Sequence, residues 1–149
     1  MSDDFVRVTL EQQQNFRFLA RYDGDTPELV VDEPAPLGGS AGPSPSQLLI
    51  TAVTNCLSDS LYFALSKFRQ PADGLRAEGI AELGRNAENR LRIVGARVTL
   101  HLGYPQAAYD KLERILGQFE QFCTVSQSIA ACLPISLQVL DSDGEVVKG

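Results

Sequence analysis

Residues 42–68 of the chain read GPSPSQLLITAVTNCLSDSLYFALSKF. This pattern predicts a helix that begins at Ser44 and continues to about position 68. Ser44 can serve as the N-cap, Pro45 suits the first helical position, and Gln47 stands where a capping-box partner belongs. Asp59 is the only charged residue between positions 46 and 66. A helix this long and this uncharged is predicted to be buried on most of its surface, at the centre of the fold or in a large interface.

The segment before this helix, residues 33–45, is rich in proline and glycine and is predicted to be a loop. Three strands are predicted upstream of the loop, at residues 5–10, 15–22 and 28–31. Downstream of the helix, residues 75–83 and 90–102 are typical of a hairpin. The apolar alternation of its second strand changes parity near Gly95, which predicts a bulge there.

Two helices and one strand are predicted in the rest of the chain. Pro105 opens the first helix, whose core stripe is Tyr109, Leu112, Leu116 and Phe119. Thr124 and Gln127 form a second candidate capping box, for a short helix that ends near position 132. Residues 135–140 are the last predicted strand, and a polar tail follows. The order β-β-β-α-β-β-α-α-β describes an α+β fold, expected as a single domain over residues 1–149.

The composition limits the partners that we expect. The chain has 149 residues, 44% of them hydrophobic, and a formal net charge of -6. An acidic chain is a poor partner for nucleic acid or for an anionic membrane, because both are polyanions. The sequence has no signal-peptide pattern and no apolar run that we expect to span a bilayer, so we expect a cytoplasmic protein.

The sequence lacks the residues that several kinds of active site need. His101 is the only histidine, and it is predicted on a strand face with Arg97 and Thr99. One histidine and three scattered cysteines make a poor zinc site. The glycine-rich residues 38–42 lack the Lys-Ser/Thr of a phosphate-binding loop. We therefore expect no metal and no organic cofactor.

The cysteines are Cys56, Cys123 and Cys132. Cys56 lies about three turns into an apolar helix, where apolar neighbours and Asp59 would raise the pKa of its thiol, so a reactive Cys56 needs a cation nearby. Cys123 lies just ahead of a predicted helix start, which favours a thiolate. From the residue pattern alone, a small buried side chain is the favoured interpretation of Cys56, and a packed thiol is the alternative for Cys123. We assign no role to Cys132.

Two motifs resemble those of the OsmC/Ohr family. Gly42-x-x-Pro45-x-x-Leu48 leads into the long helix that carries Cys56, and Cys123 stands just before a later helix. The resemblance implies an intertwined homodimer with a long central helix and thiol sites at the dimer interface. It also implies a peroxide reductase for organic hydroperoxides or hydrogen peroxide in oxidative-stress defence. In such a site Cys56 attacks the peroxide, Cys123 closes a disulfide, and an external dithiol reduces it.

The chain departs from the family pattern at one position. Ser46 stands where the family carries a glutamate, and Asp59 and Glu33 are the carboxylates that we consider in its place. The family's arginine corresponds best to Arg21, with Arg17 as the second choice. An alternative function therefore stays open: a non-catalytic homodimer that binds a small hydrophobic ligand in the interface cleft.

Overall fold

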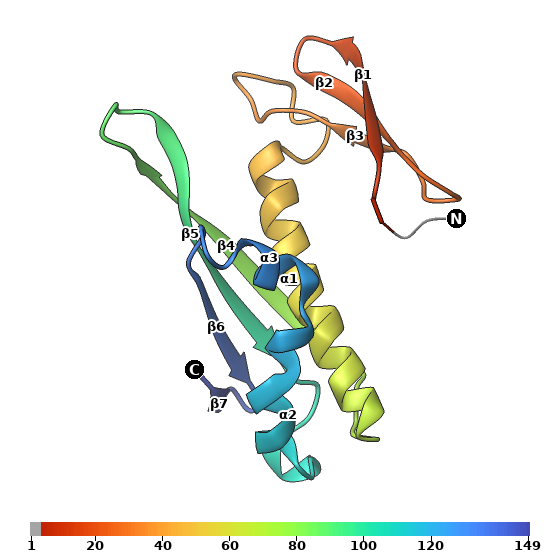
Figure 1. The fold of residues 1–149 in the computed structure, drawn as a ribbon, viewed down its shortest axis with the longest axis vertical. Helices are drawn as coiled ribbons and strands as arrows, with labels where there is room; N and C mark the ends of the chain where they lie inside the picture. The colour runs from red at the N-terminus through yellow and green to blue at the C-terminus, as the bar shows by residue number, and fades with distance from the viewer. Residues whose placement is uncertain (1–3) are drawn as a thin grey trace. The chain divides into compact units, whose positions relative to one another are not determined.

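The computed structural model describes residues 4–149. It divides into two compact units, Met1–Leu48 and Leu49–Gly149, which are described separately. The elements are strands and helices of a mixed α+β fold, and the predicted α+β class is confirmed (Figure 1).

The first unit is a three-stranded antiparallel sheet with the order β1-β2-β3. Its strands are β1 (Val8–Gln14), β2 (Arg17–Tyr22) and β3 (Leu29–Val31). Asn15 turns the chain between β1 and β2 with a φ of 51°, a left-handed conformation that asparagine tolerates. The proline-rich segment after β3 is a loop, as predicted. It packs so closely that a Cβ at Gly42 would lie 1.8 Å from the carbonyl oxygen of Val30.

The long helix α1 (Pro45–Lys67) begins where the sequence predicted. The backbone N–H of Ser44 donates to Oε1 of Gln47 at 2.9 Å, and the backbone N–H of Gln47 donates to Oγ of Ser44 at 3.2 Å. These reciprocal bonds satisfy amide groups that a helix start leaves without intrahelical partners. The predicted capping box is confirmed.

The second unit contains a four-stranded sheet with the order β4-β5-β6-β7. Its strands are β4 (Arg76–Arg85), β5 (Leu91–His101), β6 (Ile135–Leu140) and β7 (Val146–Lys148), and β5 runs parallel to β6. The register of β4 and β5 shifts where Glu82 pairs with Gly95 and Leu83 with Ile93, so the predicted bulge is confirmed. The core of this unit joins buried residues of α1, β5, β6 and the α2 region, among them Leu57, Leu61, Val98 and Ile115.

The crossover from β5 to β6 contains four short helical elements. They are η1 (Gln106–Ala108), α2 (Leu112–Gln118), η2 (Phe119–Phe122) and α3 (Thr124–Ile129). The predicted core stripe is buried, with Tyr109 at 8%, Leu112 at 7%, Leu116 at 3% and Phe119 at 0% exposure.

Three local predictions are wrong. The helix expected to open at Pro105 forms only at Leu112, because Lys111 adopts a left-handed φ of 59° and separates η1 from α2. Cys123, not Thr124, is the N-cap of α3, and the amide of Gln127 donates instead to the carbonyl of Glu120 at 3.2 Å. The predicted polar tail contains β7, which pairs with β6 through Val139 and Lys148.

Within the single chain, α1 buries one face and exposes another. Six of its residues are buried, including Val53, Leu57 and Leu61. Tyr62 and Phe63 remain 55% and 62% exposed, so the burial expected on most of the helix is not present in one chain. By length and composition α1 is also long and apolar enough to cross a membrane, contrary to the expectation from the sequence.

Candidate functional site

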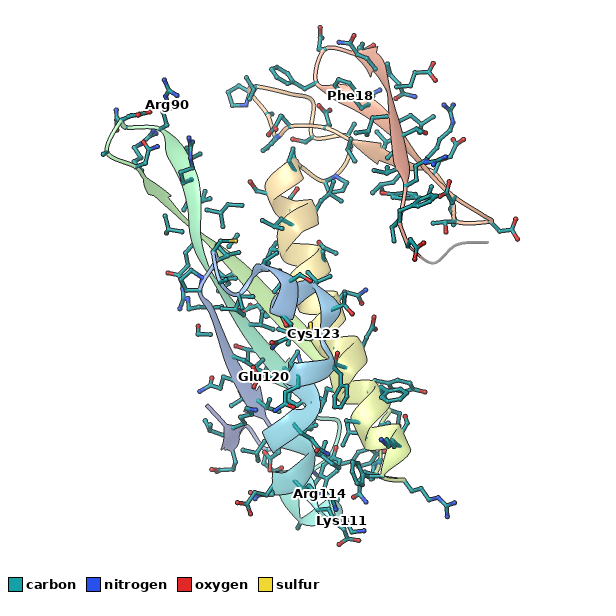
Figure 2. The ribbon with its side chains drawn as sticks, in the orientation of Figure 1. Phe18, Arg90, Lys111, Arg114, Glu120 and Cys123 are labelled. Carbon is teal, nitrogen blue, oxygen red and sulfur yellow. The ribbon has the colours of Figure 1, made fainter. Side chains whose placement is uncertain are left out.

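The fold of the second unit brings Cys56 and Cys123 together. Cys56 lies in the middle of α1. Cys123, which Figure 2 labels, is the residue between η2 and α3. The backbone N–H of Val125, in the first turn of α3, donates to Sγ of Cys56 at 3.5 Å. The side chain of Cys123 lies close enough to raise the pKa of Cys56, and both cysteines are free thiols. Two thiols separated by 67 positions therefore share one site.

Burial distinguishes the two thiols. Cys123 is 0% exposed and belongs to the main core, whereas Cys56 is half-buried at the edge of that core. The fully buried Phe119 fixes the turn that leads to Cys123, and the backbone N–H of Cys123 closes that turn on the carbonyl of Glu120 at 3.1 Å. A reagent from solvent consequently reaches Cys56 before Cys123.

The electrostatic surroundings of Cys56 favour its neutral thiol. Burial raises the pKa of the Cys56 thiol, and the Val125 N–H opposes that effect. The neighbouring Cys123 and the carboxylate of Asp59 raise the pKa of Cys56 further. None of these main influences is a cation. Activation of Cys56 as a thiolate therefore needs a positive charge in addition to these influences.

Exposed apolar side chains flank the accessible side of the thiol. Leu49, Cys56 and Phe63 recur at seven-residue spacing, which places them on the same side of α1. Leu49 is 37% and Phe63 62% exposed, and Phe122, next to Cys123 in the chain, is 65% exposed. This surface suits an apolar partner, substrate or ligand better than a strongly hydrated one.

The arginine that the sequence favoured is already paired. Arg21, in β2, makes ion pairs with Glu11 at 2.9 Å and with Glu28 at 3.1 Å. The hydrogen bonds that Arg21 donates to both carboxylates raise its pKa. Arg17, the second choice, forms no ion pair with the residues that the structure describes, and its buried Nε has no hydrogen-bond partner among them. Both arginines belong to the first unit, so neither is positioned relative to Cys56.

The carboxylates considered for the missing glutamate differ in their surroundings. Asp59 is exposed on α1, and its negative charge raises the pKa of Cys56. A carboxylate at this position therefore disfavours the thiolate. Glu33 lies in the loop of the first unit, where its carbonyl accepts a bond from the backbone of Ser40 at 3.0 Å. Ser46 is exposed in the first turn of α1.

The remaining candidate groups form no further reactive cluster. Cys132 is exposed, and its thiol donates to the carbonyl of Ile129 at 3.2 Å. His101 is half-buried at the end of β5. Within residues 4–149, no three His, Cys, Asp or Glu side chains are grouped as metal ligands.

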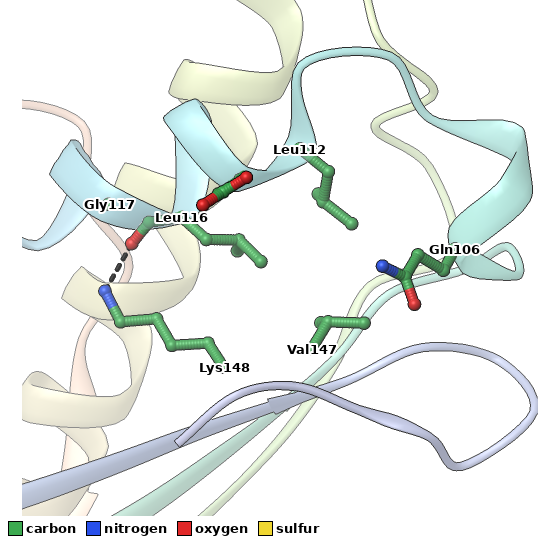
Figure 3. Close-up of a pocket in the computed structure, with 7 residues that line it drawn as sticks. Gln106, Leu112, Leu116, Gly117, Val147 and Lys148 are labelled. Carbon is green, nitrogen blue, oxygen red and sulfur yellow. Dashed lines mark hydrogen bonds between the residues drawn. The ribbon is translucent and has the colours of Figure 1, made fainter.

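A separate pocket of about 430 Å³ lies between α2 and β7 (Figure 3). Leu112, Leu116 and Val147 form its apolar part, and Gln106 lies at its edge. The ammonium group of Lys148 bonds to the carbonyl of Leu116 and pairs with Glu120 at 2.6 Å. Because its cation is already occupied and no thiol lines it, this pocket is not part of the cysteine site.

Sequence reasoning missed the backbone donor of the site. The N–H of Val125 approaches Cys56 because α3 starts at Thr124 and leaves its first amide groups without intrahelical partners. A backbone amide has no residue signature, so only the predicted helix start near Cys123 indicated that donors would be present there.

A family model and several solved structures match most of this chain. A family model described as OsmC-like protein matches residues 38–138. Similar solved structures include an OsmC-like protein of unknown function from Vibrio cholerae, with a TM-score of 0.71, 16% identity and coverage of 94% of this chain and 100% of that chain. No curated protein sequence matches this chain.

Two further structures share the fold at 12% identity. An OsmC-like protein from Mycoplasma pneumoniae has a TM-score of 0.75 and covers 94% of this chain and 99% of its own. An organic hydroperoxide resistance protein from Elizabethkingia anophelis has a TM-score of 0.69, with coverage of 95% and 99%. The match extends over nearly the whole length of each chain.

Proposed function

The chain belongs to the OsmC-like protein family, and from that membership we propose that it is a thiol-dependent peroxide reductase. The observation that supports this most directly is the contact between a half-buried Cys56 and a fully buried Cys123. Similar folds occur in organic hydroperoxide resistance proteins, which supports an organic hydroperoxide as the substrate. Hydrogen peroxide as a second substrate, oxidative-stress defence as the role and the cytoplasm as the compartment belong to the same proposal and rest on the sequence.

In the proposed reaction the thiolate of Cys56 attacks the terminal oxygen of the hydroperoxide. The O–O bond breaks, Cys56 becomes a sulfenic acid, and the alkoxide takes up a proton and leaves as an alcohol. The thiol of Cys123 then attacks the sulfenic sulfur, water leaves, and a Cys56–Cys123 disulfide remains. An external dithiol supplies the two electrons that restore both thiols.

The proposal requires a cation for the Cys56 thiolate. Arg21 is our first candidate and Arg17 the second, and either can come from the same chain or from a second copy in a homodimer. The Val125 N–H supplies one stabilising hydrogen bond at 3.5 Å, which partly offsets the effects of burial and of Asp59.

Serine variants of the three cysteines test the reaction. Cys56→Ser should abolish consumption of cumene hydroperoxide in the presence of excess dithiol. Cys123→Ser should allow one oxidation and then accumulate overoxidised Cys56. Cys132→Ser is the matched control and should change the rate little, because this exposed thiol lies outside the pair. Mass spectrometry of the treated wild type should find a Cys56–Cys123 linked peptide; equal slow rates for wild type and Cys56→Ser would contradict the proposal.

A second candidate function is binding without peroxide chemistry. The raised pKa of Cys56, Ser46 at the glutamate position, and the exposed Leu49, Phe63 and Phe122 all favour a dimer that holds a small hydrophobic ligand. Thiol titration before and after one equivalent of hydroperoxide separates the candidates. The reductase loses two thiols per chain, and the binding protein loses none.

A further inference from the structure

A pocket of about 290 Å³ lies wholly within the first unit, away from the cysteines in sequence. The turn between β1 and β2 contributes Gln14, Asn15, Phe16 and Arg17. Asp32 and the loop around Leu37 close the other side. This volume lies near the lower end of the range for small-molecule sites, so it suits a ligand of about ten non-hydrogen atoms.

Among the described residues, the cation in this pocket forms no direct ion pair, although its charge acts on nearby Asp32. Arg17 is half-buried, its Nε is shielded from solvent without a hydrogen-bond partner, and no ion pair is formed with it in residues 4–149. Three other arginines form ion pairs: Arg21 with Glu11 and Glu28, Arg90 with Glu88, and Arg97 with Glu82. A guanidinium group that is partly desolvated gains from a carboxylate ligand, which accepts two parallel N–H bonds.

The neighbouring carboxylate does not fill this role. Asp32 is 4% exposed, and its oxygens accept the backbone N–H groups of Glu33 at 2.8 Å, Gly39 at 3.1 Å and Ala41 at 3.1 Å. Burial alone would raise the pKa of Asp32, but these bonds and the charge of Arg17 lower it. The carboxylate of Asp32 therefore holds the loop that forms one wall of the pocket. The Nε–H of Arg17 stays available to a ligand.

Apolar side chains border the same pocket. Phe16 is 45% and Leu37 is 62% exposed, and Pro36 lies next to Leu37 in the lining. We infer that the pocket binds a small organic carboxylate with an apolar body, with the carboxylate on Arg17 and the body against Phe16, Pro36 and Leu37. This inference does not require the proposed peroxide reaction, although Arg17 is also the second candidate cation for the Cys56 thiolate.

Calorimetric titration of the full chain with benzoate tests the inference. Benzoate should bind saturably at one site per chain. Benzamide, which has the same ring without the charge, and inorganic phosphate, which has the charge without the ring, should each bind about tenfold more weakly or worse. Equal binding of benzamide and benzoate, or no saturable binding of benzoate, would overturn the inference.

Variants identify the site. Arg17→Gln should weaken benzoate binding by about tenfold or more, whereas Arg17→Lys should retain part of it because the charge remains. Arg90→Gln removes an exposed, paired arginine on the β4–β5 hairpin and should leave benzoate affinity unchanged. Leu37 is exposed, so Leu37→Ser should not disturb folding. This variant should bind benzoate severalfold more weakly and bind phosphate as the wild type does. Unchanged benzoate affinity in Leu37→Ser would reject the site even if the Arg17 variants failed to fold.

Discussion

At the scale of single residues, the reactivity of Cys56 depends on the charges that face it. A thiol reacts as its thiolate, and the carboxylate of Asp59 disfavours that form. Asp59→Asn should therefore lower the pKa of Cys56 and shift its alkylation profile towards lower pH. We expect iodoacetamide to modify Cys56 about two- to threefold faster at pH 7 in this variant. Asp110→Asn, on the exposed surface of the same unit, is the control; a faster reaction in both variants would indicate a general charge effect.

The candidate cation can be tested with the same assay. If Arg21 stabilises the thiolate, Arg21→Ala should raise the pKa of Cys56 and slow its alkylation at neutral pH by about threefold or more. Arg17→Ala should have a much smaller effect. The pairing of Arg21 with Glu11 and Glu28 makes this a demanding test, because part of its charge is already compensated. Equal rates in wild type and both variants would exclude both arginines.

At the scale of elements, the packing of α1 against β4 depends on one glycine. A Cβ added at Gly79 would lie 1.8 Å from Oγ1 of Thr54 and 3.1 Å from Cγ1 of Ile50. Gly79→Ala should therefore lower the free energy of unfolding by about 1–3 kcal/mol, measured by urea denaturation. Adding Thr54→Ala should recover most of that loss. Gly117→Ala, where a Cβ meets nothing within 4 Å, should leave stability unchanged or slightly higher.

Elements with local signals could be predicted, and elements that depend on distant pairing could not. The start of α1 follows from Ser44, Pro45 and Gln47, which lie within one turn of each other. The strand β7 was missed because its three residues lie in a polar tail and are held by pairing with β6. The proximity of Cys56 and Cys123 rests on how the β5–β6 crossover packs against α1, so only the family resemblance could suggest it.

At the scale of the whole molecule, we expect the exposed apolar face of α1 to be buried against a second copy of the chain. Tyr62 and Phe63 are more than half exposed on a helix with one charge between positions 46 and 66. We expect a homodimer that buries about 2,000 Å² or more, whose separated chains are not stably folded. Analytical ultracentrifugation at micromolar concentration should show one species of twice the chain mass of 16.2 kDa. A folded monomer under these conditions would contradict this expectation.

A substitution on that face gives a more specific test of the assembly. Phe63 is 62% exposed in the single chain, so Phe63→Glu has little reason to disturb the core of an isolated chain. It should nevertheless dissociate or unfold the dimer, because a buried unpaired carboxylate is costly at an interface. Val146→Glu, at a similarly exposed residue of β7, should leave the sedimentation unchanged.

The crossover that carries Cys123 is anchored at both ends. It leaves the sheet at the end of β5 and returns at β6, and these two strands are hydrogen-bonded neighbours. This double attachment restricts how far the Cys123 thiol can move from Cys56, so the effective concentration of one thiol at the other greatly exceeds that of any thiol in solution. A small thiol that forms a mixed disulfide with Cys56 should therefore be displaced by Cys123. For this reason glutathione adducts on Cys56 should be short-lived, and they should persist when Cys123 is replaced by serine.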